Sequence, residues 1–216
     1  MRSYGQYCSV AKALDVLGER WTLLIVRELL TRGACRYTDL RAGLPGIATN
    51  LLADRLRELE AAGIVEREDA PPPVATTLFS LTERGLALEP VLSELGRWGV
   101  PLMRDSSADD QFRGQWLRLP VRMFLTDRQP DRPASTVEVR AGDETVVIDA
   151  AAGKVSMRLG ADSNADAVLT GSPPEILRLM SGAVTLRQAV KRGLRIDGSR
   201  AAIERILPER PPAVAT

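Results

Sequence analysis

Residues with the chemistry to read a nucleic acid are concentrated between Arg32 and Arg57. That stretch holds five arginines against two aspartates, whereas the whole chain of 216 residues has a net charge of only +1. An arginine can pair with guanine or a phosphate, and an asparagine can both donate and accept at adenine. We therefore expect contact with double-stranded DNA to depend on this local patch and not on overall charge. The arginines are Arg32, Arg36, Arg41, Arg55 and Arg57.

Catalytic and metal chemistry has few candidate groups in this chain. There is no histidine, the commonest general base and transition-metal ligand, and there are only two cysteines, Cys8 and Cys35. A zinc site of Cys and His ligands cannot be assembled from them. No nucleophile–base pair and no glycine-rich phosphate loop is recognisable. We expect no catalytic residues, no metal, no cofactor and no enzymatic activity.

Cys8 is a candidate redox-sensitive thiol. It precedes a predicted helix over 9–17, and Lys12 lies one turn further on, so a helix N-terminus and a cation could both lower its pKa. The alternative is that Cys8 is a small apolar residue in a packed seam, since free cysteines are usually buried. Cys35 lies in a predicted loop over 31–36 and has less support as a functional thiol.

Composition and hydropathy indicate a globular chain away from membranes. Hydrophobic residues make up 44% and charged residues 26%, which are ordinary globular values. No stretch approaches the length of a membrane span, and Met1 to Val10 lacks the apolar centre of a signal peptide. With two cysteines, too few for a disulfide framework, we expect a cytoplasmic protein with no membrane contact.

The first half is predicted to be mainly helical, because its apolar residues recur at helical spacing. The helices are predicted over 9–17, 20–30, 37–42, 48–62 and 82–98, the last capped by Thr82, and two short strands over 64–67 and 77–80. Between the strands, prolines 71–73 cannot lie in a central strand and predict a loop. This order of helices followed by a hairpin is that of a winged helix-turn-helix.

The helix over 48–62 carries the candidate base-reading face. If Leu52, Leu56 and Leu59 point inward, the advance of about 100° per residue turns Asn50 and Arg57 outward. A recognition helix reads base edges with its N-terminal turns, and a wing contacts the backbone or minor groove. The alternative is an amphipathic surface helix with an ordinary solvated face. The candidate DNA-contacting residues are Arg36, Thr38, Thr49, Asn50, Ala53, Asp54, Arg57 and Arg67.

The second half mixes strands and helices. Its β-branched or alternating runs, separated by glycine-containing turns, predict strands. Strands are predicted over 137–140, 145–149, 155–159, 167–170 and 194–196, and helices over 174–180, 186–191 and 199–207, the last capped by Ser199. The polar segment 103–113 separates the halves, so we predict domains at 1–104 and 116–216 with a linker over 105–115.

Three runs of the first half form a specific motif string: Ala13-Leu14-Asp15-Val16-Leu17-Gly18, Leu44-Pro45-Gly46-Ile47 and Ser80-Leu81-Thr82-Glu83-Arg84-Gly85. With them, Cys8 to Trp98 resembles the HxlR-type branch of winged-helix regulators, related to the MarR-like repressors. The resemblance implies a transcription regulator that binds a palindromic operator as a homodimer. In some relatives the position of Cys8 is a redox sensor. Relatives commonly carry Ser where this chain has Ala48, so the recognition helix is expected to be capped differently.

The resemblance also implies where the subunits meet, namely at the first helix and the helix after the wing. Apolar residues on both helices suit that role: Val10, Ala13, Leu14, Leu17, Leu92, Leu95 and Trp98. The alternative is that these side chains form only the core of one subunit.

Two runs of the second half, Ala165-Asp166-Ala167-Val168-Leu169-Thr170-Gly171-Ser172 and Gly193-Leu194-Arg195-Ile196-Asp197-Gly198-Ser199, carry a second resemblance. Trp116 to Leu207 resembles the sterol-carrier-protein-type α+β fold, which implies an apolar tunnel for a lipid-like molecule. The candidate lining residues are Trp116, Leu119, Val121, Met123, Phe124, Met157, Leu159, Leu177, Met180 and Val190. A solid core is the alternative. Arg118, Arg122 and Arg158 could anchor a carboxylate at the mouth or be solvated.

The expected fold is thus a mainly-α winged helix-turn-helix domain followed by an α+β sterol-carrier-like domain. The leading function is a DNA-binding regulator that responds to a small hydrophobic ligand. The alternative is a carrier or sequestering protein for such a ligand, dimerised by its first half.

Overall fold

The computed structural model describes residues 3–71, 75–105 and 110–209. Contacts divide the chain into two units, Met1–Leu95 and Gly96–Thr216, and the division falls within the helix α6 (Glu89–Gly99). Pro72 and Pro73 of the predicted proline loop lie outside the described residues, as do residues 106–109 of the predicted linker.

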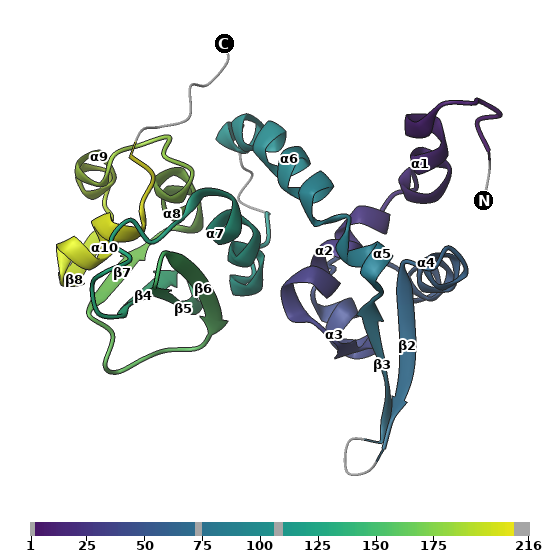
Figure 1. The fold of residues 1–216 in the computed structure, drawn as a ribbon, viewed down its shortest axis with the longest axis horizontal. Helices are drawn as coiled ribbons and strands as arrows, with labels where there is room; N and C mark the ends of the chain where they lie inside the picture. Colours follow the sequence, from purple (N-terminus) through teal and green to yellow (C-terminus); the bar gives the residue numbers. More distant parts are fainter. Residues whose placement is uncertain (1–2, 72–74, 106–109, 210–216) are drawn as a thin grey trace. The chain divides into compact units, whose positions relative to one another are not determined.

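The first unit has the element order of a winged helix-turn-helix (Figure 1). Its helices are α1 (Ser9–Leu17), α2 (Thr22–Arg32), α3 (Tyr37–Ala42), α4 (Thr49–Ala61) and α5 (Glu83–Leu86), and its strands are β1 (Cys35–Arg36), β2 (Val65–Ala70) and β3 (Thr76–Leu81). The strands form an antiparallel sheet in the order β1-β3-β2, in which β2 and β3 are the wing. The bounds of α1 and α3 are those predicted from the sequence.

Three predictions for the first unit differ from the structure. The helix expected from residue 20 begins at Thr22, because Trp21 has a φ of +79°, a left-handed conformation that no helical residue adopts. The helix expected over 82–98 is two helices, α5 and α6. Pro90, in the first turn of α6, has no N–H to continue a ladder of helical hydrogen bonds. Residues 35–36, expected in a loop, pair with Phe79 and Leu78 as β1.

A buried carboxylate of α2 lies close to the backbone at the end of α3. The side chain of Glu28 is fully buried and forms ion pairs with Arg27 at 2.8 Å and Arg32 at 3.2 Å. A Cβ atom placed on Gly43, directly after α3, would lie 2.1 Å from Glu28 Oε2. Glycine therefore follows α3 because the backbone approaches this carboxylate closely.

The second unit is a five-stranded mixed sheet with helices on one face (Figure 1). Its helical elements are η1 (Val100–Asp105), η2 (Gly114–Leu117), α7 (Arg118–Phe124), α8 (Pro173–Met180), α9 (Leu186–Lys191) and α10 (Arg200–Ile206). Its strands are β4 (Ser135–Ala141), β5 (Glu144–Ala151), β6 (Lys154–Leu159), β7 (Ala167–Gly171) and β8 (Arg195–Gly198), in the order β6-β5-β4-β7-β8. Within this sheet β4 and β7 pair in parallel, and the other neighbouring strands pair antiparallel. Ser199 caps α10, as predicted, by accepting a hydrogen bond from the N–H of Ala202.

The core of the second unit lies between the sheet and its helices. Alternate residues of the central strands, such as Val137 and Val139 on β4 and Ile148 on β5, pack with Ile176 and Leu179 of α8. The period-two pattern that predicted these strands therefore gives the buried face of the sheet. The predicted strand at 194–196 begins one residue later, at Arg195, and Leu194 is a buried core residue before it.

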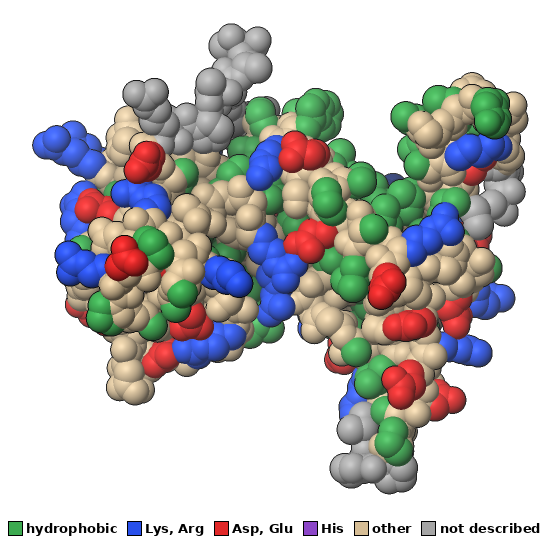
Figure 2. All heavy atoms as spheres, viewed as in Figure 1, with side chains coloured by type: hydrophobic (Ala, Val, Ile, Leu, Met, Phe, Trp, Pro, Cys, Tyr) green, Lys and Arg blue, Asp and Glu red, His purple; other side chains and the backbone are tan. Residues whose placement is uncertain are grey.

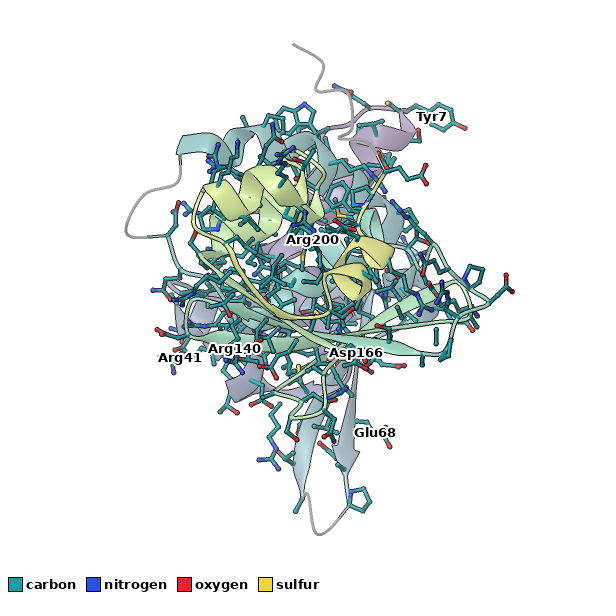
Figure 3. All side chains as sticks on the ribbon, turned by 90° about the vertical axis from the view of Figure 1, so that its left-hand side faces the viewer. Tyr7, Arg41, Glu68, Arg140, Asp166 and Arg200 are labelled. Carbon is teal, nitrogen blue, oxygen red and sulfur yellow. The ribbon has the colours of Figure 1, made fainter. Side chains whose placement is uncertain are left out.

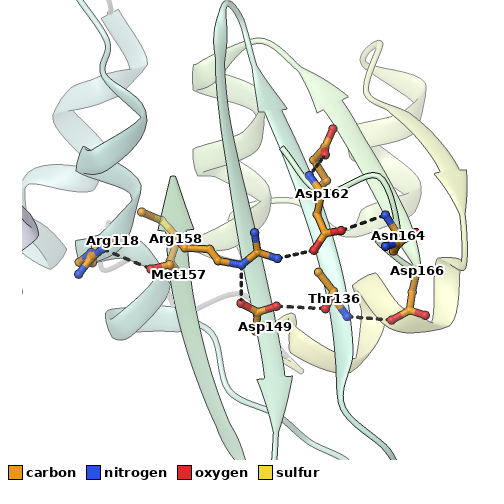
Figure 4. Close-up of polar contacts among 9 residues, drawn as sticks. Arg118, Thr136, Asp149, Met157, Arg158, Asp162, Asn164 and Asp166 are labelled. Atoms are coloured by element: carbon orange, nitrogen blue, oxygen red, sulfur yellow. Dashed lines mark hydrogen bonds and ion pairs between the residues drawn. The ribbon is translucent and has the colours of Figure 1, made fainter. Parts of the chain in front are cut away.

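The other face of this sheet carries a polar network (Figure 4). Asp149 accepts hydrogen bonds from Arg158 at 3.3 Å and from the hydroxyl of Thr136 at 3.0 Å. Arg158 also pairs with Asp162, whose N–H donates to the buried carboxylate of Glu138 at 2.7 Å. The segment between β6 and β7 is thereby tied across this face, and both acids next to Arg158 satisfy its guanidinium.

A buried ion pair joins α10 to the segment after α7. Asp127 accepts hydrogen bonds from Nε and Nη2 of Arg205 at 2.6 and 2.8 Å, and from the N–H groups of Gln129 and Gly153, both at 3.0 Å. Arg205 also donates to the carbonyl of Pro133 at 2.7 Å. Every ionised group of the pair is thus satisfied, which is the condition under which a buried pair is tolerated.

Candidate nucleic-acid interface

The helix α4 is held by its apolar side and by one hydrogen bond at its start. Leu52, Leu56 and Leu59 are buried, as the spacing predicts. Ala48 is the N-cap and offers no side-chain hydrogen bond, in agreement with the expectation from its residue type. Instead, the hydroxyl of Tyr37, the first residue of α3, donates to the carbonyl of Thr49 at 2.7 Å. This contact links the first helix of the helix-turn-helix to the start of the second.

The outward face of α4 is polar at its N-terminal end. Thr49 and Asn50 are exposed, and Ala53 is half-buried beside them. Asp54 and Arg57 are exposed and form an ion pair with each other. To contact a base or a phosphate, Arg57 would have to give up its ion pair with Asp54. Arg55 differs, because it is half-buried and its guanidinium pairs with Glu19 at 3.2 Å and with Glu58.

Arg67, the predicted contact of the wing, lies among acidic residues. Arg67 is exposed, yet its Nε lies 3.2 Å from Glu60 Oε1 of α4. Its neighbours Glu66 and Glu68 are also exposed, and Figure 3 labels Glu68 at the wing. Among the described wing residues, acids outnumber bases, so these strands offer a phosphate little attraction.

Further exposed cations lie on α3 and before α2. Arg36 and Thr38, both candidates from the sequence, are exposed at the start of α3. Arg41, labelled in Figure 3, is exposed near its end, and Arg20 lies over the ring of Trp21 at 5.6 Å. Arg41 was counted in the arginine-rich stretch but not among the candidate contacts. Its exposure on the first helix of the helix-turn-helix, which crosses the DNA backbone in this motif, is the signal that adds it.

The two cysteines have opposite environments. Cys8 is exposed at the N-terminus of α1, where the N–H groups of Ala11 and Val10 hold the pKa of its thiol below the ordinary value. Cys35 is buried in β1, and burial raises the pKa of its thiol to about 11. Since the thiolate is the reactive form, Cys8 has the chemistry of a reactive thiol and Cys35 does not.

The predicted lining residues of the second unit lie at different depths. Met157, Met180 and Val121 belong to the buried core, and Phe124 and Leu177 pack against it. Trp116, Leu119 and Met123 are half-buried, whereas Leu159 and Val190 are 51% and 41% exposed. Arg118 donates to the carbonyl of Met157 at 3.3 Å. The candidate lining residues are thus divided between the packed core, its margin and the surface.

Comparison with known proteins places the first unit in a family. Residues 16–107 match the family described as HxlR-like helix-turn-helix. Over 98 residues the chain is 39% identical to the uncharacterized HTH-type transcriptional regulator YvaP of Bacillus subtilis. The matched region covers 45% of this chain and 90% of YvaP. The chain belongs to the HxlR-like helix-turn-helix family. Its relatives are transcriptional regulators, and the first unit is a winged helix-turn-helix.

Other relatives cover the same half. The chain is 34% identical over 105 residues to an uncharacterized HTH-type transcriptional regulator of Synechocystis, covering 49% of this chain and 77% of that protein. It is 38% identical over 86 residues to the HTH-type transcriptional regulator YodB of Bacillus subtilis, covering 40% and 76%. The solved structure of reduced YodB covers 47% of this chain and 100% of that chain, at 33% identity and a TM-score of 0.41. The HxlR-like match ends at residue 107, so most of the second unit lies outside it.

In the described part of the chain, none of the helices combines the length and hydrophobicity that a membrane span requires.

Proposed function

We propose that this HxlR-like protein regulates transcription by binding double-stranded DNA through α4, with further contacts from α3 and from Arg67, the basic residue of the wing strands. The observation that carries the proposal is the exposed polar end of α4, where Thr49, Asn50 and Arg57 stand free of the core formed by the other side of the helix. Asn50 suits an adenine and Arg57 a guanine or a phosphate. Arg36 and Thr38 contribute at the start of α3.

A selection experiment tests this assignment. Duplexes that the full chain retains from a random-sequence library define the preferred site, and binding is then measured by fluorescence anisotropy. Asn50→Ala and Arg57→Ala should each weaken binding to that site by about 1–3 kcal/mol if the side chain reads a base. Lys154→Ala, which removes an exposed cation of the second unit, is the control and should leave selectivity unchanged. Unchanged affinity in both α4 variants would refute the assignment.

The proposal includes a homodimer that binds a palindromic operator. Large apolar side chains are exposed on both helices that the sequence suggests for the interface: Val10 is 64% exposed on α1, and Trp98 is 71% exposed on α6. Figure 2 shows hydrophobic side chains gathered over both helices. Leu14 and Leu95 are exposed beside them, whereas Leu92 is buried in this chain. Exposed apolar patches of this kind mark association sites. In a two-fold dimer the half-sites would lie about 34–36 Å apart.

An apolar cleft adds to the support for this interface. It has a volume of about 300 Å³ and lies beside α1. Its lining residues are Lys12, Ala13, Val16, Leu17, Ile64, Arg84 and Leu88. Ala13 and Leu17 were assigned to the interface from the sequence, and a partner subunit would cover the cleft together with them.

We also propose that the second unit senses a small hydrophobic molecule, in keeping with its resemblance to sterol-carrier-type domains. Helices on one face of a twisted sheet, with Met157 and Met180 between them, support this assignment. An effector alters DNA binding only if it binds the competent and incompetent states with unequal affinity. Its site lies among the half-buried side chains Trp116, Leu119 and Met123 and the core residues beside them.

Thermal unfolding of the full chain with fatty acids, sterols and polyketides tests the ligand assignment. A ligand at a hundredfold excess over its dissociation constant should stabilise the folded state by about 2.7 kcal/mol. Met180→Trp should abolish the stabilisation by filling the site, and Val190→Trp, at an exposed position, should not. Stabilisation without any selected duplex would indicate a carrier protein instead. No stabilisation by any compound would indicate a solid core.

Cys8 is proposed as a redox-sensitive position within the same regulator. Its exposure and its lowered thiol pKa support this role, and its position at the N-terminus of α1 would transmit a modification to the proposed dimer helix.

A further inference from the structure

The second unit carries a basic surface that the proposed functions leave unexplained. Residues 176–196 contain five Lys or Arg and no Asp or Glu. They cover most of α8, all of α9 and the start of β8. The five cations are Arg178, Lys191, Arg187, Arg192 and Arg195.

Two of these cations share one acid and three have none. Glu175 pairs with Arg178 at 2.5 Å and with Arg192 at 3.0 Å. Arg187, Lys191 and Arg195 are exposed, and no acidic side chain in the described part of the chain pairs with them. The surface therefore keeps an excess of positive charge that folding does not neutralise.

Two of the three unpaired cations lie on one face of α9. Arg187 and Lys191 are four residues apart on α9, so they lie on the same face of that helix, which turns Leu186 and Ala189 into the core. The chain then reverses at Gly193, whose φ is +102°, and the N–H of Leu194 donates to the carbonyl of Ala189 at 3.1 Å. Arg195 follows as the first residue of β8, the edge strand of the sheet, and lies between the core-facing residues Leu194 and Ile196. Because side chains alternate along a strand, Arg195 is on the opposite face of the sheet from α9.

The geometry points to this surface, centred on Arg187 and Lys191 of α9, as a second DNA contact that binds phosphates without reading sequence. This inference rests on the proposed DNA binding and adds a contact outside the winged helix. Residues 1–104 contain 13 Lys or Arg and 13 Asp or Glu, a net charge of zero, and the wing strands are acidic. Phosphate contacts supply most of the non-specific affinity of DNA-binding proteins, so a neutral winged helix gains from cations elsewhere in the chain.

The side chains favour DNA over an anionic membrane. A membrane-binding helix inserts a broad apolar face, but Val190 is the only exposed apolar side chain on α9.

The salt dependence of DNA binding by the full chain tests the inference. Arg187→Ala/Lys191→Ala keeps good helix formers on α9, and Arg132→Ala/Lys154→Ala removes two exposed cations elsewhere in the second unit as the matched control. Binding to a random-sequence 40-base-pair duplex is measured by anisotropy between 50 and 200 mM salt. For each protomer that engages the duplex, the α9 variant should lower the slope of log affinity against log salt by about 1.8. Over that fourfold range, the wild type should then lose about twelvefold more affinity than the variant.

The possible results separate the proposals. A lower slope in the α9 variant, with the control at the wild-type slope, supports the contact. An unchanged slope in the α9 variant, or an equal reduction in the control, overturns it while leaving α4 recognition intact. A wild type that binds no duplex overturns both this inference and the proposed function. If the variant keeps the wild-type slope but loses retention on vesicles of phosphatidylserine and phosphatidylcholine, the surface is a lipid contact and the inference is wrong.

Discussion

Gly85 lies in α5, where the two wing strands meet this helix. Replacing it should lower the stability of the first unit, because a larger side chain would collide with the backbone. A Cβ atom at this position would lie 2.2 Å from the carbonyl oxygen of Ile64 and 3.0 Å from Cδ2 of Leu81. Close carbon–oxygen contacts in proteins are about 3.3–3.6 Å. Gly85→Ala must therefore displace a backbone carbonyl by about 1 Å. That carbonyl also accepts a hydrogen bond from the N–H of Thr82 at 3.0 Å.

The expected loss combines three effects. Forcing an extra methyl group into a packed site costs about 1–3 kcal/mol. Weakening the hydrogen bond from Thr82 costs about 1 kcal/mol more. Alanine has a higher helix propensity than glycine, which stabilises α5 by about 1 kcal/mol and offsets part of this loss. We expect Gly85→Ala to destabilise the first unit by about 1–3 kcal/mol in total and to weaken DNA binding by displacing the wing.

Gly63, at the other side of the same hairpin, provides the matched comparison. Its φ is +67° and no atom lies within 4 Å of an added Cβ, so only the left-handed backbone opposes a side chain there. Asparagine tolerates that conformation better than alanine does. Gly63→Asn should therefore be milder than Gly63→Ala, whereas Gly85→Asn should be worse than Gly85→Ala.

Urea unfolding of the full chain can measure these differences. Trp21 reports on the first unit when Trp98 and Trp116 are replaced by phenylalanine in every variant. The steric explanation fails if Gly85→Ala leaves the unfolding midpoint unchanged. It also fails if asparagine is better tolerated than alanine at both positions.

Three further predictions concern acid stability, redox chemistry and assembly. Hydrogen bonds from Arg205 hold the pKa of Asp127 below its ordinary value, so its stabilising effect is present above the unfolded pKa of about 3.9 and is lost as pH falls toward the lower folded value. Asp127→Asn should destabilise the second unit at neutral pH and flatten its loss of stability in acid, as measured by Trp116 fluorescence, whereas Arg200→Ala, which breaks an exposed pair with Glu204 on the same helix, should do neither. Cys8→Ser should keep DNA binding but lose its inhibition by diamide, and a wild type whose binding is insensitive to diamide would remove the redox role. Trp98→Glu should shift the chain from dimer to monomer in analytical ultracentrifugation and reduce affinity for a palindromic duplex, while a variant that sediments like the wild type would place the interface elsewhere.

The local elements of this protein could be predicted from its sequence. The bounds of α1, α3 and α9 match the apolar spacing, and Leu52, Leu56 and Leu59 are buried as that spacing requires. Thr82 and Ser199 cap the helices that they precede. Helical periodicity and capping depend on residues within one or two turns, so they can be read without knowledge of distant neighbours. The motif string of the first half also identified the HxlR-like family.

Other features were decided only by tertiary structure. The parallel pairing of β4 with β7 and the ion pair between Asp127 and Arg205 join residues far apart in the chain, and no local pattern marks such partners. The two residues of β1 are a strand only because β3 lies beside them. The pairing of Arg67 on β2 with Glu60 on α4 likewise depends on how the fold brings two elements together. In the sequence, Gly85 is one residue of a family motif. The structure explains why a glycine is needed there, because the carbonyl of Ile64 lies close to it once the wing packs on α5.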